Sequence, residues 1–283
     1  MLRRKYHKFP YIILLIANCS ILIYTFYKNK DRKRLLVSLG SNISMAIIFE
    51  YFTINLLKGY RYKPRILMNK YQDHILGAVF SQGIFVPFTA LFITAFHLGW
   101  KFKLMASLFY TSIELLFLRL GIYAHKWWKT SYTLILLPVY FWICDKWYYY
   151  LKLRNPAVLF VSYFHLLFVT TIHSLFFQSI IGKVKFGFGR FNSWREHFIL
   201  MPLYSLVVVV FTERIEKTRN SLIIYIKMLF YRLLLDKLLI KFKLMKFEQK
   251  NVHKNLPFHI FMILLSSYYK RIVYEKPNKK SSP

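Results

Sequence analysis

Two carboxylates, Glu50 and Glu114, stand inside long apolar stretches of a chain that holds only 11 Asp and Glu among 283 residues. A charge in hydrocarbon is costly, and acidic side chains placed there commonly line ion or substrate pathways. Such a carboxylate can carry or exchange protons. The alternative is a structural carboxylate that bonds a neighbouring helix or pairs with a loop cation. Arg119 is a poor partner for Glu114, because a five-residue helical spacing rotates it by about 140°.

Other patterns that carry chemistry are absent. His165 and His173 share one apolar stretch, but the chain has no HExxH motif, no His pair spaced i, i+4 and no Gly-rich phosphate loop. It also has no CxxC motif, and the two cysteines, Cys19 and Cys144, lie singly in apolar stretches, as small packing residues do. The sequence therefore predicts no metal, no cofactor and no enzymatic activity.

The elements that position these carboxylates are apolar runs of 15 to 25 residues with almost no charge. They lie at about 10–27, 35–57, 75–97, 104–120, 130–145, 157–181 and 198–212. A helix needs about 20 apolar residues to cross a bilayer, and only helices or closed barrels satisfy their backbone there. The sequence predicts an all-α, polytopic transmembrane helix bundle with six or seven spans. It shows no repeat of 20–50 residues and no inverted repeat.

The chain is strongly basic, with 42 Lys and Arg and a formal net charge of +31. Nucleic-acid binding is disfavoured, because the cations lie at the ends of the apolar runs. There they alternate with Tyr and Trp, for instance in 60–65, 126–129 and 146–150. This pattern is typical of membrane interfaces, where aromatic rings sit at headgroup depth and cations meet anionic lipid.

The last quarter of the chain differs in character. Residues 213–283 hold 16 Lys and Arg, and their two apolar stretches, 221–240 and 256–269, are interrupted by charge or short. We interpret 1–212 as a transmembrane bundle and 213–283 as a basic interfacial or cytoplasmic tail with interfacial helices, disordered over 276–283. Basic residues at both termini favour two cytoplasmic ends. That requires an even number of crossings, whereas seven runs are present.

Several segments resemble an uncharacterised family of small multi-pass membrane proteins from low-GC, spore-forming Gram-positive bacteria. The segments are Glu50-Tyr51, Tyr60 to Pro64, Ile66-Leu67, Asp73 to Gly77, Ser81-Gln82, Glu114 to Tyr123, His125, Trp127 to Lys129 and Tyr132-Thr133. The resemblance covers roughly 30–180 and implies a helical protein of the bacterial plasma membrane, with no activity attached. It also places Asp73, Tyr123 and His125 in its motifs beside Glu50 and Glu114.

Three functions remain open. The first is a non-enzymatic integral membrane protein that associates with anionic membrane lipids or with other membrane proteins. The alternative is a transporter or channel for protons, ions or a small solute, with Glu50 and Glu114 lining a polar path. The third, an intramembrane enzyme acting on lipid, would need a catalytic constellation that the sequence does not contain.

Overall fold

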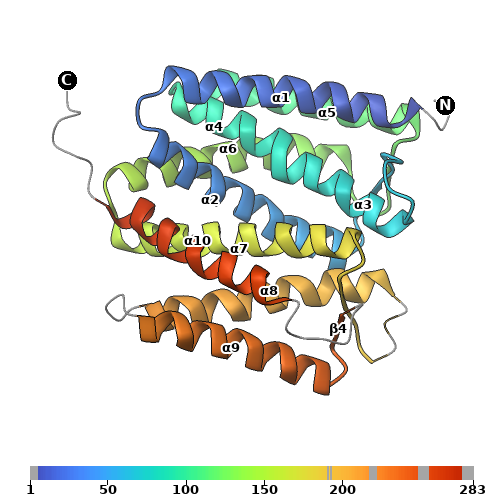
Figure 1. Ribbon diagram of the computed structural model, residues 1–283. Helices are drawn as coiled ribbons and strands as arrows, with labels where there is room; N and C mark the ends of the chain where they lie inside the picture. Colours follow the sequence, from blue (N-terminus) through green and yellow to red (C-terminus); the bar gives the residue numbers. More distant parts are fainter. Residues whose placement is uncertain (1–5, 190, 192, 217–221, 248–254, 276–283) are drawn as a thin grey trace. The chain divides into compact units, whose positions relative to one another are not determined.

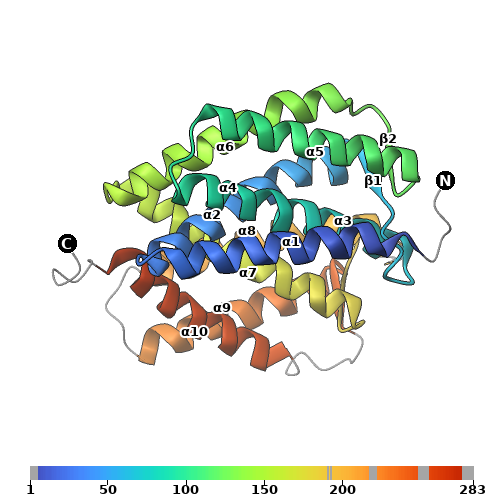
Figure 2. The same cartoon turned by 90° about the horizontal axis from the view of Figure 1, so that it is seen from above.

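The computed structural model describes residues 6–189, 191, 193–216, 222–247 and 255–275 (Figures 1 and 2). The chain divides into two compact units, Met1–Asn155 and Pro156–Pro283, called unit 1 and unit 2 below. Both units are built almost entirely from helices, so the prediction of an all-α fold is confirmed.

Unit 1 contains a short pair of strands among long helices. In chain order its elements are α1 (Lys8–Lys28), α2 (Arg32–Glu50), the π-helical η2 (Tyr51–Leu56), β1 (Tyr60–Tyr62), α3 (Lys70–Ala78), the π-helical η3 (Val79–Phe85), α4 (Val86–Ala95), α5 (Trp100–Leu120), β2 (Tyr123–His125) and α6 (Thr130–Lys152). The segment α3–η3–α4 runs as one continuous helix that packs against α1, α2 and α6. Its π-helical turn lies just before Pro87, where the sequence indicates a bent or closely packed helix.

Unit 2 has six elements among its described residues. They are α7 (Pro156–Ile180), β3 (Val184–Phe186), α8 (Trp194–Glu216), α9 (Leu222–Lys241), β4 (Met245–Phe247) and α10 (Leu256–Tyr274). Its two strands form an antiparallel pair, as β1 and β2 do in unit 1. Residues 276–283, for which the sequence predicts disorder, lie outside the described residues.

The two units repeat one architecture. After α1, unit 1 reads helix, strand, helix, helix, strand, helix, and unit 2 has the same order. The first helix of each repeat, α2 with η2 in one and α7 in the other, is 25 residues long. The packing within the units also corresponds: the four helices pack in a closed ring, each against the next and the last against the first.

Specific hydrogen bonds recur in the two repeats. The amide of Tyr62, the last residue of β1, donates to Nδ1 of His74 at 3.1 Å, and the amide of Phe186, the last residue of β3, donates to Nδ1 of His197 at 3.0 Å. The residue before each histidine is acidic, Asp73 or Glu196, and accepts from backbone amides of the loop after the strand. The repeat is therefore visible in bonding as well as in element order.

Five helices of the described chain are long and apolar enough to cross a membrane. They are Lys8–Lys28, Arg32–Leu56, Lys70–Ala95, Pro156–Ile180 and Trp194–Ile215. Apart from α1 they are the first two helices of each repeat, so the pattern of hydropathy repeats as well. The predicted six or seven spans and the interfacial position of the helices after 213 stay predictions. The division at 212 also stays a prediction. It concerns membrane against tail, whereas the two units are divided by packing at Asn155.

Candidate functional site

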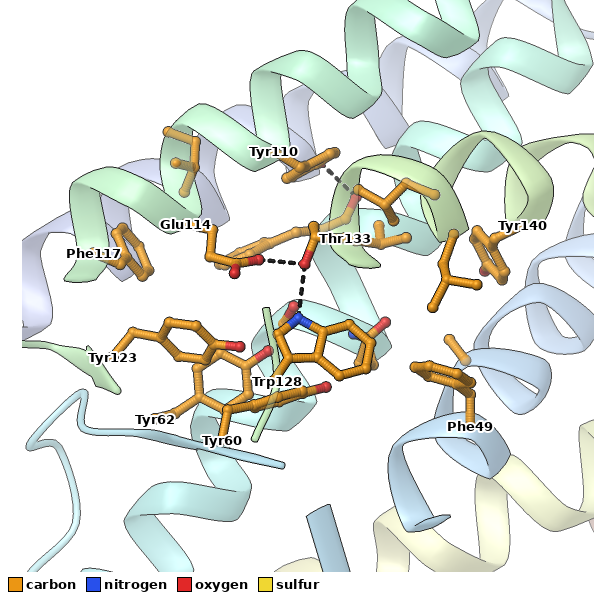
Figure 3. Close-up of a pocket in the computed structure, with 18 of the residues that line it drawn as sticks. Phe49, Tyr60, Tyr62, Tyr110, Glu114, Phe117, Tyr123, Trp128, Thr133 and Tyr140 are labelled. Atoms are coloured by element: carbon orange, nitrogen blue, oxygen red, sulfur yellow. Dashed lines mark hydrogen bonds between the residues drawn. The ribbon is translucent and has the colours of Figure 1, made fainter. Parts of the chain in front are cut away.

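Unit 1 contains a partly open cavity of about 450 Å³. It is lined by side chains from α1, α2, β1, η3, α4, α5, β2 and α6, and most of them are aromatic or aliphatic (Figure 3). A cavity of this size, mostly apolar with a few converging polar groups, is typical of small-molecule sites. Because these walls come from most of its elements, the site depends on the fold of the whole unit.

Glu114 lies on the wall of this cavity at the centre of a hydrogen-bonded chain. His125 Nε2 lies 2.6 Å from Glu114 Oε1, and Thr133 Oγ1 donates to Glu114 Oε2. Trp128 Nε1 donates to the same Thr133 oxygen at 2.9 Å. Because an indole N–H can only donate, the hydroxyl proton of Thr133 is left for the carboxylate. The turn that allows this begins at Gly121, whose left-handed φ of 73° ends α5 and leads the chain into β2.

Glu50 lies outside the cavity lining, next to its wall. It is 6% exposed at the end of α2, and its Oε2 accepts from the Tyr60 hydroxyl and from Thr53 Oγ1. Its Oε1 is buried with no hydrogen-bond partner among the described residues. The ring of Tyr60 lines the cavity, so this tyrosine connects Glu50 to the site.

Three tyrosines of the strand pair form one face of the cavity. Tyr123 packs against Tyr60 and Tyr62, with ring centroids 5.3 and 5.0 Å apart. Burial raises the pKa of all three phenols well above the ordinary value, and the Glu50 carboxylate adds to the rise at Tyr60 and Tyr62. The phenols therefore keep their protons at neutral pH, and the hydroxyl of Tyr60 donates to Glu50.

Asp73, singled out by the resemblance, is 5% exposed and lies outside the cavity lining. Its carboxylate accepts from the amides of Arg65, Ile66 and Leu67 at 2.7 to 2.9 Å. Three charge-assisted bonds to one loop hold the chain between β1 and α3. The structure thus brings Glu114, Tyr123 and His125 together, places Glu50 beside them, and gives Asp73 a loop-holding position.

Sequence reasoning missed two polar clusters of unit 1. In the first, the Tyr110 hydroxyl lies 2.7 Å from Thr89 Oγ1, 2.8 Å from the Phe85 carbonyl oxygen and 3.1 Å from Asn18 Oδ1. In the second, Lys103 forms an ion pair with Asp145. The i, i+4 rule within one helix cannot find these contacts, because each joins residues on different helices.

Unit 2 holds a carboxylate, Asp236, at the position that matches Glu114 in unit 1. Glu114 and Asp236 each lie nine residues before the first residue of the following strand, Tyr123 or Met245. Each also bonds the fourth residue of the next helix, Thr133 in α6 or His259 in α10, the latter at 2.9 Å.

Asp236 is fully buried, unlike Glu114. The Tyr204 hydroxyl donates to its Oδ1 at 2.7 Å, and Asn255 Nδ2 donates to its Oδ2 at 3.0 Å. Together with His259 these bonds use both carboxylate oxygens.

Among the described residues, no group of three or more His, Cys, Asp or Glu side chains converges to hold a metal ion. No protein-family model, no curated protein and no solved structure matches this chain. The family resemblance therefore stays a prediction.

Proposed function

We propose that this chain is an integral membrane protein of the transporter class, whose first unit binds a small, largely apolar molecule in the cavity beside Glu114. The cavity carries this proposal. It favours the second function predicted from the sequence over lipid association alone, because association with lipid needs no cavity of this size. In this proposal Glu114 contacts the ligand directly, and Glu50 acts through Tyr60.

We propose that further helices cross the membrane besides the five apolar ones. The other long helices, α5, α6, α9 and α10, are 19 to 23 residues long, enough to cross a hydrocarbon core. Their exposed faces are rich in large apolar side chains; on α9 these are Leu222, Ile223, Ile226, Phe230, Leu234 and Leu238. Buried charges such as Asp236 and Arg232 face the interior of the unit and lower the mean hydropathy without facing lipid.

We therefore propose nine crossings, α1 and the four helices of each repeat, in place of six or seven. In this arrangement α9 and α10 cross the bilayer, whereas the sequence predicts interfacial helices. The exposed Lys227 and Lys237 of α9 lie near its ends, from which a lysine side chain can reach the headgroups.

Saturable photolabelling tests the binding site. The probe is tritiated 3-(trifluoromethyl)-3-phenyldiazirine, a small apolar carbene precursor, used on the full chain in detergent. Cavity labelling should be displaced by excess unlabelled probe and should map to the peptides that contain Trp128 and Tyr110. Labelling of the lipid-facing surface should not saturate.

A matched pair of variants on α5 completes the test. Ile113 lines the cavity, and Leu116 is 45% exposed and does not line it. Ile113→Trp should remove the saturable component, and Leu116→Trp, which adds the same ring outside, should keep it. The proposal is overturned if no labelling saturates in the unmodified protein, or if both variants keep it equally.

The association function remains the second candidate, because 42 Lys and Arg against 11 Asp and Glu favour binding to anionic lipid. It predicts that phosphatidylglycerol stays bound to the protein in native mass spectra. Replacing loop cations should remove this bound lipid. It also predicts no consequence of filling the cavity.

A further inference from the structure

The charge around the cavity indicates what kind of molecule it holds. Glu114 is the one charged side chain among the described residues that line it, in a chain where cations outnumber anions almost fourfold. The rest of the lining includes seven tyrosine and tryptophan rings: Tyr11, Tyr60, Tyr62, Tyr110, Tyr123, Trp128 and Tyr140. Aromatic faces and a carboxylate attract cations and disfavour anions.

The second repeat has a different residue at the position that matches Tyr110 of the cavity wall. Tyr110 and Arg232 each lie four residues, about one helical turn, before the carboxylate of their repeat, Glu114 or Asp236. The partners correspond too. Tyr110 bonds Thr89, and Arg232 Nη2 donates to Thr212 Oγ1 at 2.9 Å; each threonine lies fifteen residues after the repeat's strand-binding histidine.

Arg232 is 1% exposed, so unit 2 buries a guanidinium one helical turn from its carboxylate. Unit 1 has a tyrosine at that position and a cavity. The matching position in unit 1 therefore holds an uncharged side chain beside a cavity, whereas unit 2 has a buried cation there.

We propose that the cavity of unit 1 binds an organic cation, with Glu114 as its counter-charge and the tyrosine and tryptophan rings as its walls. This inference rests on the proposed function and adds the class of ligand. The carboxylate is oriented for this role, because His125 and Thr133 each hold one oxygen, and an ionised carboxylate keeps further lone pairs for a ligand. Quaternary ammonium groups are recognised in this way by aromatic cages.

Three isosteric probes separate charge from shape. They are benzyltrimethylammonium, a cation; neopentylbenzene, in which carbon replaces the charged nitrogen; and phenylmethanesulfonate, an anion of similar outline. Each is used tritiated, with the full chain in detergent, and saturable binding is measured by scintillation proximity. We expect the cation to bind at least about tenfold more tightly than the neutral isostere, and the anion not to bind.

A variant assigns that preference to Glu114. Glu114→Gln keeps the size of the side chain and should reduce the affinity for benzyltrimethylammonium about tenfold, while the affinity for neopentylbenzene changes little. The comparison of the three probes on the unmodified protein needs no variant, so the inference stays testable if Glu114→Gln does not fold.

The outcomes separate the inference from the proposed function. If neopentylbenzene binds as tightly as the cation, or the anion binds best, the cation inference is overturned while a small-molecule site remains. If no probe binds saturably, both are overturned.

Discussion

Tyr60 and His125 face each other in the antiparallel pair of β1 and β2, and each bonds one of the two carboxylates that stand out in the sequence. Tyr60 donates to Glu50 at the end of α2, and His125 lies against Glu114 on α5. Three residues of each strand thus join two helices that are far apart in the chain. The strand pair is the element that brings Glu50 and Glu114 to one site.

Replacing Tyr60 by Phe should destabilise the protein by about 1–3 kcal/mol, because Glu50 Oε2 then loses its Tyr60 donor in a buried place. Unfolding in mixed micelles with increasing dodecyl sulfate measures this change. Tyr149→Phe, at a residue that is 53% exposed, is the matched control and should be nearly neutral. Adding Glu50→Leu to Tyr60→Phe should recover much of the loss. A double variant as unstable as the sum of the two single variants would contradict the pairing.

The loop role of Asp73 predicts a graded loss of stability. Asp73→Ala removes three acceptor bonds and should cost roughly 3 kcal/mol. Asp73→Asn keeps one acceptor oxygen and should cost less. Glu196→Ala, at the matching position of unit 2, should be milder still, because one amide bond to its carboxylate is described.

These same variants, where they fold, should bind the cationic probe normally, since Asp73 does not line the cavity. Binding is compared at equal amounts of monodisperse protein. A folded Asp73→Asn protein with weakened binding would show that the carboxylate has a role at the site.

A side chain at Gly77 should clash with its neighbours. A methyl group there would lie well inside van der Waals contact of Tyr62 Cβ, because α3 approaches β1 closely. Gly77→Ala should therefore lower the thermal midpoint in detergent and disturb the strand pair that holds the site. Gly99→Ala is the matched control, since nothing lies within 4 Å of an added carbon there. Equal midpoints for the two variants would contradict the close approach.

The proposed nine crossings would place the two ends of the chain on opposite sides of the membrane. Terminal tags probed by protease in sealed, oriented vesicles measure this directly. Protection of one tag and digestion of the other is the expected result. Equal accessibility of both tags would support an even number of crossings, as the basic termini predict by themselves.

Many of the helices could be predicted from the sequence because a long, continuous apolar run predicts a helix with an apolar surface. Runs such as 157–181 reappear within a residue or two as Pro156–Ile180. The same rule says less about helices with interior charge. Asp236 and Arg232 interrupt the apolar stretch of α9, yet both side chains are buried in unit 2.

The site was only partly predictable. Glu50 and Glu114 could be found from the sequence because a carboxylate in an apolar run is unusual. The cavity and the strand pair leave no such signal, because a three-residue strand is too short for a periodic pattern. The repeat was missed because several matched positions hold different residues, as Tyr110 and Arg232 do, or Thr133 and His259. Equal spacing of acidic residue and histidine, Asp73-His74 and Glu196-His197, was the signal that could have found it.

The most direct test of the ligand site transfers the residue of one repeat into the other. Tyr110→Arg places in unit 1 the cation that unit 2 carries at Arg232, and Tyr110→Phe is the control that keeps the ring. With tritiated benzyltrimethylammonium and detergent-purified full chain, we predict saturable binding to the unmodified protein and to Tyr110→Phe. We predict none to a folded Tyr110→Arg protein. Undiminished binding to folded Tyr110→Arg would contradict the account.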